Sequence, residues 1–584
     1  MHMNKNIARL AVTAGLTAAL SFGGVMAPVT MAFAAEGSTV TFSDTGYDKT
    51  STYKGIQIFK ATVTTTDGAK TVSNIKWASD DAEAAVVAAI QEKDRFYNSE
   101  NAQDAADWLS DNAGTDSKVA SDNVLSSIAA KLDGKDGWQT TTAGSPSLSG
   151  LDAGYWLFLT ATAGKPDGKS TDGFTSPVYA VIDGESTTTV TPKKDVPTVE
   201  KKVLDDADAV SDDIKGSDKW KDVADSQIGQ EVNYKLTGTI ASNYATFSTY
   251  AYKFTDVLSD GLDYVDGSVE VYAVNHDVYN KIEGSKYEVA CANNTLTVDF
   301  KVDGTKKGLK DVADVDANTQ IVVFYKAKLN SNAVIGNAAN DKKGGNPNTV
   351  KLEYSNNPYA AGTGETLEDT VADFAFKLNL NKVDQGTEKG LAGAVFTIQS
   401  DDANTARQYV ASKDAAGVVA GQLVTVADAK NLPDYVKFTS GEDGKITVPG
   451  LDAGSYKVTE LRTPDDTKYT KANPFTFTIK ADYDETAMKV TNLTAAVSES
   501  DKGRTDIAFG TLDGTAGDHT LTGVEGTGTD AVAGEVTINV GNAKSVGLPI
   551  TGLDGVTLTW VAGGAVLVIG VAHLIRSRRE ESEE

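Results

Sequence analysis

The stretch FKLNLNK, residues 376–382, alternates apolar and polar side chains with a period of two. In a β-strand this spacing places Phe376, Leu378 and Leu380 on one face. Lys382 comes next on that same face. The pattern therefore predicts a strand that buries one side, and it directs a lysine toward the core, where an isolated ammonium group is costly.

A second lysine has the same surroundings in PTVEKKV, where Val199 and Val203 stand on either side of Lys201. Burial penalises the charged form of a lysine, so the neutral amine, which is a nucleophile, becomes available. If an Asn carboxamide faces such an amine, amide exchange can join the two side chains and release ammonia. A neighbouring carboxyl group can move the protons. We therefore predict that these buried lysines are converted into neutral isopeptide crosslinks.

The acid and amide partners for Lys201 lie on matching faces of later strands. Asp256 continues an apolar stripe that includes Tyr252 and Phe254. Asn348 begins a second stripe, which continues through Val350 and Leu352. Because each group shares a face with core residues, we predict a triad of Lys201, Asp256 and Asn348.

Lys382 has an equivalent pair of partners. Glu460 follows Tyr456 and Val458 on one face of a predicted strand, and Asn542 follows Val540 on another. The sequence therefore predicts a second triad of Lys382, Glu460 and Asn542.

The chain of 584 residues is too long for one core, and its 54 glycines and many Thr and Val runs favour β structure. We predict a mainly β protein built from tandem β-sandwiches of immunoglobulin-like size, over residues 35–190, 191–372 and 373–545. Helix-forming runs within 80–132 predict a helical insertion in the first of them.

The charge and the cysteine content exclude several classes of function. A net charge of −27 excludes a basic nucleic-acid-binding face, and Cys291, as the single cysteine, cannot form an intramolecular disulfide. The sequence has no paired-Cys or HExxH zinc spacing, no nucleophile elbow and no phosphate-binding loop. We therefore expect no metal, no cofactor and no enzymatic turnover beyond the single-turnover formation of crosslinks.

The N-terminal 34 residues have the features of a secretory signal peptide. Lys5 and Arg9 precede an apolar stretch, and MAFAAEG offers a cleavage site after Ala34. We therefore predict that the chain is exported.

The C-terminal segment, 546–584, combines an LPITG pentapeptide with an apolar run over 556–575, which is about one bilayer span. A basic end made by Arg576, Arg578 and Arg579 follows, as expected for a cytoplasmic flank. This combination resembles the cell-wall sorting signal of Gram-positive surface proteins. The resemblance implies transient membrane anchoring, followed by sortase cleavage between the last two of the motif residues Leu548, Pro549, Thr551 and Gly552.

Further motifs extend the resemblance to a family. YKVTELRTP (456–464) resembles the E-box of Gram-positive major pilins, and LNLNKVD (378–384) resembles the opening strand of their Cna-B-type domains. The chain thus resembles sortase-assembled backbone, or shaft, pilins. The resemblance implies that Glu460 is the catalytic acid, Lys382 the isopeptide lysine and Asn542 the last-strand asparagine.

PTVEKKV, FTDVLSDGL and NTVKLEYSNNP resemble the middle domain of the same pilins. The resemblance implies the isopeptide roles of Lys201, Asp256 and Asn348. Asn356 remains an alternative to Asn348, and Asn492 remains an alternative in the third segment.

VTPKK (190–194) resembles the pilin motif, whose lysine attacks the threonine that sortase holds on the next subunit. The matching residue is Lys193, with Lys194 as the alternative, and Thr191 stands where the family usually has tyrosine. An internal repeat of GLDAG places Thr160 where the third segment has Glu460. We therefore expect no crosslink of the E-box type in the first segment.

The resemblance implies a structural subunit of a covalent cell-surface pilus that supports adhesion. Its implied partners are a pilin-specific sortase, a housekeeping sortase, further copies of itself and peptidoglycan, together with tip or base pilins and host surface ligands. The alternative is a monomeric wall-anchored adhesin that binds a host ligand. That alternative needs no acceptor lysine in the linker.

Overall fold

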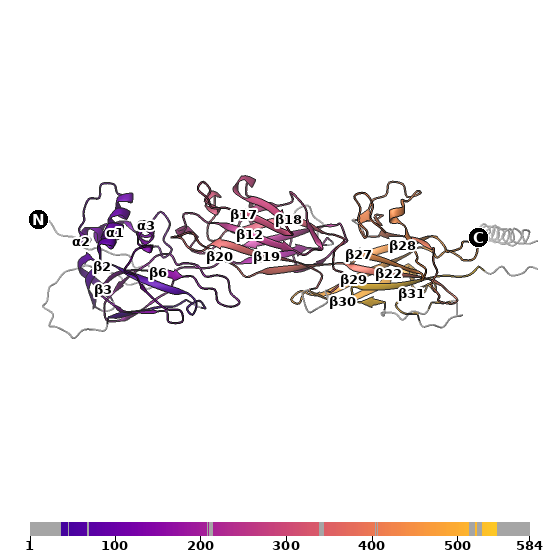
Figure 1. Ribbon diagram of the computed structural model, residues 1–584, viewed down its shortest axis with the longest axis horizontal. Helices are drawn as coiled ribbons and strands as arrows, with labels where there is room; N and C mark the ends of the chain where they lie inside the picture. The colour runs from indigo at the N-terminus through magenta and orange to yellow at the C-terminus, as the bar shows by residue number, and fades with distance from the viewer. Residues whose placement is uncertain are drawn as a thin grey trace, which may run out of the picture.

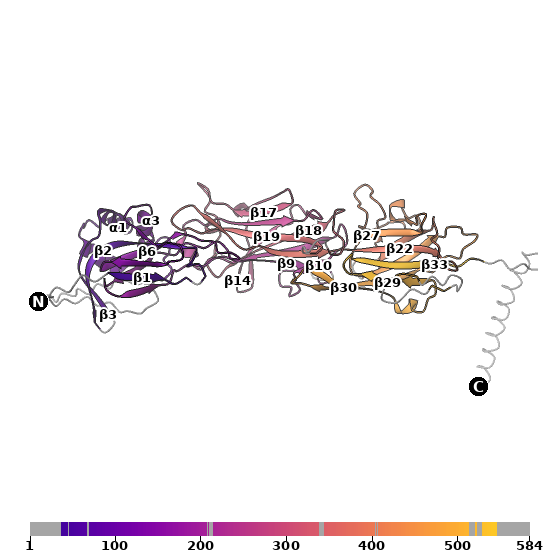
Figure 2. The same ribbon diagram turned by 60° about the horizontal axis from the view of Figure 1, so that its bottom comes forward.

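The computed structural model describes residues 37–545, apart from residues 45, 67–68, 207, 209–213, 338–343, 403–404, 406, 513–519 and 522–527. The described chain forms an elongated row of three bodies, in chain order from one end to the other (Figure 1). We call residues 37–190 the first body, 196–374 the middle body and 376–545 the third body. Figure 2 shows the same row after rotation about its long axis. The fold is mainly β, as the sequence predicted.

The first body is a small β-sandwich with three helices. One sheet has the order β5-β1-β8, and the other has the order β3-β2-β6-β7, with β4 paired to β2. The strands are β1 (Ser38–Phe42), β2 (Thr52–Thr66), β3 (Ala69–Trp77), β4 (Gln139–Thr140), β5 (Ser147–Leu151), β6 (Gly154–Thr162), β7 (Val178–Ile182) and β8 (Thr187–Val190). Separate apolar clusters fill the space between the sheets and the space beneath the helices.

The helices lie between β3 and β4 in the chain, where the sequence predicted a helical insertion. They are α1 (Asp80–Lys93), α2 (Ala102–Asn112) and α3 (Val124–Asp133). Each begins at a side-chain cap, because Ser79, Asn101 and Asn123 accept hydrogen bonds from backbone N–H groups of the first turn. All three lie together in the first body (Figure 1).

The middle body is a sandwich of two larger sheets, which enclose one apolar core. Their orders are β15-β14-β18-β11-β9, with β13 paired to β18, and β10-β21-β19-β12-β17-β16, with β20 paired to β19. The first sheet comprises β9 (Val199–Leu204), β11 (Glu231–Gly238), β13 (Leu262–Tyr264), β14 (Glu270–Asn275), β15 (Val278–Lys281) and β18 (Gln320–Leu329). The second comprises β10 (Val223–Asp225), β12 (Tyr252–Leu258), β16 (Glu288–Ala292), β17 (Thr295–Phe300), β19 (Asn346–Ser355), β20 (Thr363–Glu365) and β21 (Asp369–Phe374).

The third body is also a two-sheet sandwich, with sheet orders β27-β22-β33-β31, with β32 paired to β33, and β25-β24-β23-β28-β29-β30, with β26 paired to β23. The first sheet comprises β22 (Phe376–Asp384), β27 (Lys445–Leu451), β31 (Ile507–Phe509), β32 (Thr529–Asp530) and β33 (Glu535–Asn542). The second comprises β23 (Val395–Ser400), β24 (Tyr409–Val410), β25 (Leu423–Val424), β26 (Phe438–Thr439), β28 (Ser455–Arg462), β29 (Phe475–Asp484) and β30 (Lys489–Val497). Its opening and closing long strands, β22 and β33, pair in parallel.

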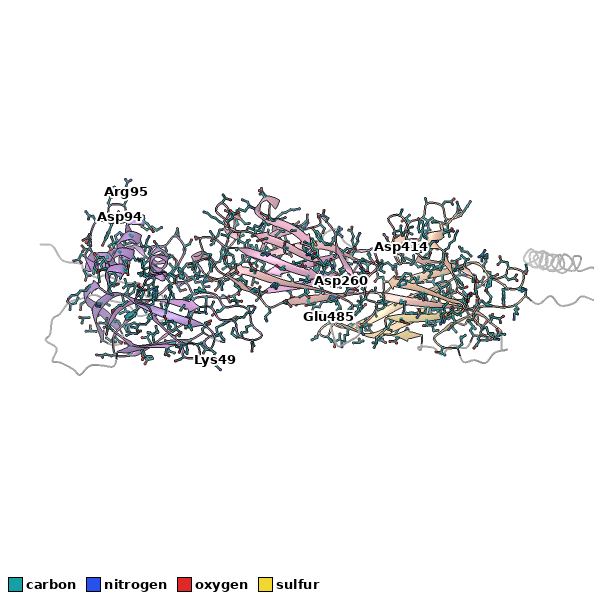
Figure 3. All side chains as sticks on the ribbon, in the orientation of Figure 1. Lys49, Asp94, Arg95, Asp260, Asp414 and Glu485 are labelled. Atoms are coloured by element: carbon teal, nitrogen blue, oxygen red, sulfur yellow. The ribbon has the colours of Figure 1, made fainter. Side chains whose placement is uncertain are left out.

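Contacts join neighbouring bodies along the row. Val223, Ala372 and Phe374 of the middle body belong to the apolar core of the third. Figure 3 shows Asp260 of the middle body and Glu485 of the third near this junction. Because apolar side chains are shared across the junction, the middle and third bodies pack directly on each other.

Candidate functional sites: two buried lysine, acid and asparagine clusters

The sandwich of the middle body brings together the three residues that the sequence grouped. Lys201 lies on β9, at the edge of one sheet, while Asp256 and Asn348 lie on the adjacent strands β12 and β19 of the facing sheet. The register pairs Leu258 with Asn348, so Asp256 stands diagonally beside the asparagine. Each of the three side chains is completely buried.

The contacts in this middle cluster are short and direct. The Lys201 ammonium donates to both carboxylate oxygens of Asp256 at 2.6 Å, and to the Tyr325 hydroxyl at 2.9 Å. The Tyr325 hydroxyl donates to Asp256 Oδ2 at 2.6 Å and accepts from Asn348 Nδ2 at 2.6 Å. Tyr325 therefore bridges the acid and the carboxamide, while Asn348 Oδ1 has no hydrogen-bond partner.

Burial determines the electrostatics of the cluster. Desolvation lowers the pKa of Lys201 to about 8, although the Asp256 carboxylate opposes the shift. Desolvation also raises the pKa of Tyr325 well above its usual value, so this hydroxyl keeps its proton. The amine can thus become neutral near physiological pH, beside a carboxyl group and a phenol that can relay protons.

Sequence reasoning missed Tyr325 and its neighbour Tyr234. The two rings stack with centroids 5.2 Å apart, and the Lys201 ammonium lies 5.2–5.3 Å from both centroids. A signal was present, because Tyr325 continues the inward alternation of Ile321 and Val323 along β18. A tyrosine hydroxyl directed into an apolar core needs a polar partner.

The third body brings its three predicted residues together from different strands. Lys382 and Asn542 lie on the parallel neighbours β22 and β33, where Lys382 pairs with Val540 and Asp384 pairs with Asn542. Glu460 comes from β28 in the facing sheet. Lys382 and Asn542 are completely buried, and Glu460 is 3% exposed.

In this third-body cluster the glutamate contacts the other two side chains. Asn542 Nδ2 donates to Glu460 Oε2 at 2.9 Å, and the Lys382 ammonium lies 3.8 Å from Glu460 Oε1. The ammonium also donates to the Val540 carbonyl at 3.0 Å. Burial lowers the pKa of Lys382 to about 8, against the opposing charge of Glu460. Glu460 Oε1 and Asn542 Oδ1 have no hydrogen-bond partner.

The alternative asparagines lie elsewhere. Asn356 is buried at the junction with the first body, where its Nδ2 donates to the Asp172 carbonyl at 3.1 Å. Asn492 is exposed and donates to Asp482 at 3.0 Å. Neither carboxamide takes part in the hydrogen bonds of the two lysine clusters.

The two linker lysines differ sharply. The backbone of Lys193 is held on both sides, since its N–H donates to Thr175 Oγ1 at 2.7 Å and its carbonyl accepts from the Ser176 N–H at 2.9 Å. Within the described chain its ammonium has no hydrogen-bond or ion-pair partner. The Lys194 side chain is only 4% exposed, and its ammonium contacts Asp44 and Asp172.

Thr160 lies in β6, buried in the first body, and its hydroxyl accepts from the Thr175 N–H at 3.1 Å. The Thr160 hydroxyl therefore pairs with a backbone N–H group and not with a lysine side chain. Across the described parts of the chain, no group of three or more His, Cys, Asp or Glu side chains is arranged to hold a metal ion. Cys291 is exposed.

The predicted processing signals lie outside the described residues. These are the signal peptide 1–34, the LPITG residues 548–552 and the apolar run 556–575. None of the helices in the described ranges is both long and apolar enough to cross a bilayer.

Family models match two segments of the chain. Residues 228–358 match the model of the Gram-positive pilin backbone subunit 2, Cna-B-like domain, and residues 376–494 match the SpaA prealbumin-like fold domain. The matched range 228–358 includes Asp256, Tyr325 and Asn348, and the matched range 376–494 includes Lys382 and Glu460.

The chain also resembles individual proteins. It is 26% identical to the trypsin-resistant surface T6 protein of Streptococcus pyogenes over 314 residues, and the match spans 47% of this chain and 50% of that protein. Among solved structures, the T6 backbone pilin of serotype M6 Streptococcus pyogenes is 14% identical with a TM-score of 0.48, covering 88% of this chain and 99% of that one. The major pilin SpaD of Corynebacterium diphtheriae is 16% identical with a TM-score of 0.43, at the same coverage.

Proposed function

We propose that this chain is the repeating structural subunit of a covalently assembled surface pilus, and that it carries isopeptide bonds from Lys201 to Asn348 and from Lys382 to Asn542. The observation that carries the proposal is the pair of clusters, each of which buries a lysine, a carboxyl group and a carboxamide that are connected through hydrogen bonds or an ion pair. Burying three such groups is costly unless they react or pair. The match of residues 228–358 to a Gram-positive pilin backbone domain favours the same interpretation.

The chemistry of each bond follows from the contacts. The neutral lysine Nζ attacks the Asn side-chain carbonyl carbon, the new N–C bond forms, and the original C–N bond breaks to release ammonia. The carboxyl group, Asp256 in the middle body and Glu460 in the third, carries the proton from the attacking amine to the leaving group. The product has no charge, so the desolvation cost of the buried ammonium disappears.

Between subunits, the acceptor is Lys193 and the donor is Thr551, which sortase holds after cleaving before Gly552. Support for Lys193 over Lys194 comes from their surroundings, because an acceptor needs a free amine. Lys193 has a clamped backbone and an unpaired ammonium, whereas Lys194 is enclosed by carboxylates. A pilin-specific sortase would join the subunits, and a housekeeping sortase would attach the finished fibre to peptidoglycan.

The test is a boiled SDS gel of cell-wall extract from the native host, blotted for this chain. Wild type should give a high-mass ladder that collapses to monomer in Lys193→Ala, while the matched control Lys194→Arg, which keeps the buried charge, should keep the ladder. A ladder that survives in Lys193→Ala and disappears in Lys194→Arg would move the acceptor by one residue. A single band in wild type would overturn the polymer and leave the wall-anchored adhesin.

A further inference from the structure

A third lysine with a buried side chain is Lys194, which lies in the linker after the first body and packs against that body. Its ammonium contacts Asp172 Oδ2, lies 2.7 Å from Asp44 Oδ2 and donates to the Tyr53 hydroxyl at 3.3 Å. The Tyr53 hydroxyl in turn donates to Asp44 Oδ2 at 2.6 Å. Asp172 and Tyr53 are 1% and 0% exposed, so the cluster is closed to solvent except beside Asp44.

This arrangement shares a lysine, an acid and a tyrosine with the middle cluster. Lys194, Asp44 and Tyr53 contact one another as Lys201, Asp256 and Tyr325 do, with the phenol donating to the acid in both.

The aromatic surroundings match as well. The Lys194 ammonium lies 5.2 Å and 5.6 Å from the ring centroids of Tyr53 and Tyr47, much as Lys201 lies between two tyrosines. Where the middle cluster presents the carboxamide of Asn348, this cluster presents the carboxyl group of Asp172.

We propose that Lys194 and Asp172 form a third intramolecular isopeptide bond, promoted by Asp44. The step is a condensation: the neutral Nζ attacks Cγ of the protonated Asp172 carboxyl, the N–C bond forms and the bond from Cγ to the hydroxyl oxygen breaks. The second amine proton leaves with that oxygen as water, and Asp44 carries it across. No oxidant or further reactant is needed.

The contacts distinguish the electrophile from the promoter. A carboxylate anion is a poor electrophile, and burial raises the pKa of Asp172, against the opposing charge of Lys194. The Ser51 hydroxyl at 2.5 Å and the Gly173 N–H at 2.8 Å orient its two oxygens. Asp44 is more exposed and takes the phenol hydrogen bond, which is the position of Asp256 in the middle body.

The bond would fix the linker beside the acceptor lysine. Asp172 lies in a segment that also holds the middle body, since its carbonyl accepts from Asn356 and the Thr171 N–H donates to the Glu365 carbonyl. Figure 3 shows Lys49, from the loop that contributes Asp44, on the part of the first body nearest the middle body. A crosslink here would tie Lys194, and so the neighbouring Lys193, to the junction of the two bodies.

Tandem mass spectrometry of peptides from the full chain tests the bond. Wild type should yield a branched peptide that joins Lys194 to Asp172 and is lighter than its two parts by one water. The isosteric variant Asp172→Asn should yield the same branched peptide, but with the loss of ammonia from the intact precursor chain. Lys194→Arg keeps the charge, folds with an ion pair and should yield only linear peptides.

Two further variants separate the roles. Asp44→Ala should leave both reactants unjoined, with the crosslinks of the other two bodies intact, whereas Lys193→Ala should keep the branched peptide. Linear peptides covering both Lys194 and Asp172 in wild type would overturn the proposal and leave an ion pair only. Branching from Lys194 to Asp44 would also overturn it, by exchanging the roles of the two acids. This readout is independent of polymerisation, so it can fail while the pilus assignment stands.

Discussion

The middle and third bodies assemble the same three kinds of side chain in different ways. In the middle body the lysine and the asparagine face each other across the core, from β9 of one sheet and β19 of the other. In the third body they lie on neighbouring parallel strands of one sheet, and the acid crosses the core instead. The proposed bond would therefore join strands of facing sheets in the middle body and neighbouring strands of one sheet in the third body.

The positions of the two proposed bonds determine which strands would carry a pulling force. With the proposed bond in place, a force that enters the third body at the start of β22 would pass six residues to Lys382, cross to Asn542 and leave the body (382 − 376 = 6). In the middle body, the proposed bond ends at Asn348, and the chain from there to Ala375 stays in the load path (375 − 348 = 27). The proposed bonds would thus keep the load off nearly all of the third body, whereas β19, β20 and β21 of the middle body would carry it.

Removing the acid of the third body should have the largest effect. Without Glu460 we expect no amide to form. The intact mass of Glu460→Ala should therefore lack the loss of one ammonia that the third-body bond causes in wild type. The variant should also lose a constraint on 160 residues (542 − 382 = 160), which is about 5 kcal/mol by loop entropy. Calorimetry should show the melting temperature of that body falling by roughly 10–20 °C.

The exposed Glu442 offers a matched control, and Glu442→Ala should change neither the loss of ammonia from the intact mass nor the melting temperature. Under force, Glu460→Ala should let the third body unravel between the strands that the bond would join. If Glu460→Ala loses as much ammonia as wild type, the glutamate is not required for the bond to form.

The wild-type chain should give a smaller extension, from the middle body alone. Pulling between the linker and the C-terminal end should release at most 27 residues, or roughly 90 Å of chain, as β19 to β21 detach. Single-molecule force spectroscopy measures this length directly. An extension several times longer would mean that the Lys201–Asn348 bond does not carry the load, and Asp256→Ala should produce such an extension.

Tyr325→Phe should slow the middle crosslink without abolishing it. The phenol bridges Asp256 and Asn348, and the third-body cluster has no equivalent tyrosine in its hydrogen bonds. We expect ammonia loss in the middle body to slow by about a hundredfold, the lower range for a positioned proton-transfer group. Time-resolved intact mass after refolding measures the rate.

Tyr234→Phe is the matched control for Tyr325→Phe, because the Tyr234 ring stacks on Tyr325 while only the Tyr325 hydroxyl donates to Asp256. Its rate should equal that of wild type. Equal rates in both variants would remove Tyr325 from the relay, and the middle cluster would then work as the third one does.

The pH dependence of bond formation should be shared by the two bodies. The reactive form of each lysine is neutral, and burial lowers the pKa of both Lys201 and Lys382 to about 8. Below that value the rate should fall about tenfold per pH unit as the neutral fraction falls. Mass spectrometry of chains refolded from pH 6 to 8 would show it, and a rate independent of pH would exclude the neutral amine as the limiting species.

Much of this molecule follows from the alternation of its strands. The period of two predicted which faces of six strands turn inward, and with them six buried polar side chains, one on each of β9, β12, β19, β22, β28 and β33. The helical insertion was also readable, because its caps and apolar spacing are local signals. The roles of Lys193 and of the residues beyond 545 stay predictions from motifs.

Alternation could not decide which inward residues meet. Asn348 and Asn356 lie eight positions apart, so both turn inward, yet one meets Tyr325 and the other meets the first body. The cluster around Lys194 is a stronger case, because Asp44, Asp172 and Lys194 come from distant parts of the first body and the linker, and no periodic pattern joins them.

The sequence by itself therefore determined that lysines would be buried, since burial of a strand face depends only on its own side chains. Only the tertiary structure decided their partners, because sheet order, register and the packing of one body on another set the distances between residues far apart in the chain. The local pattern predicts which residues are candidates for a reactive cluster. Only the packing of the two sheets brings those residues within reach of one another.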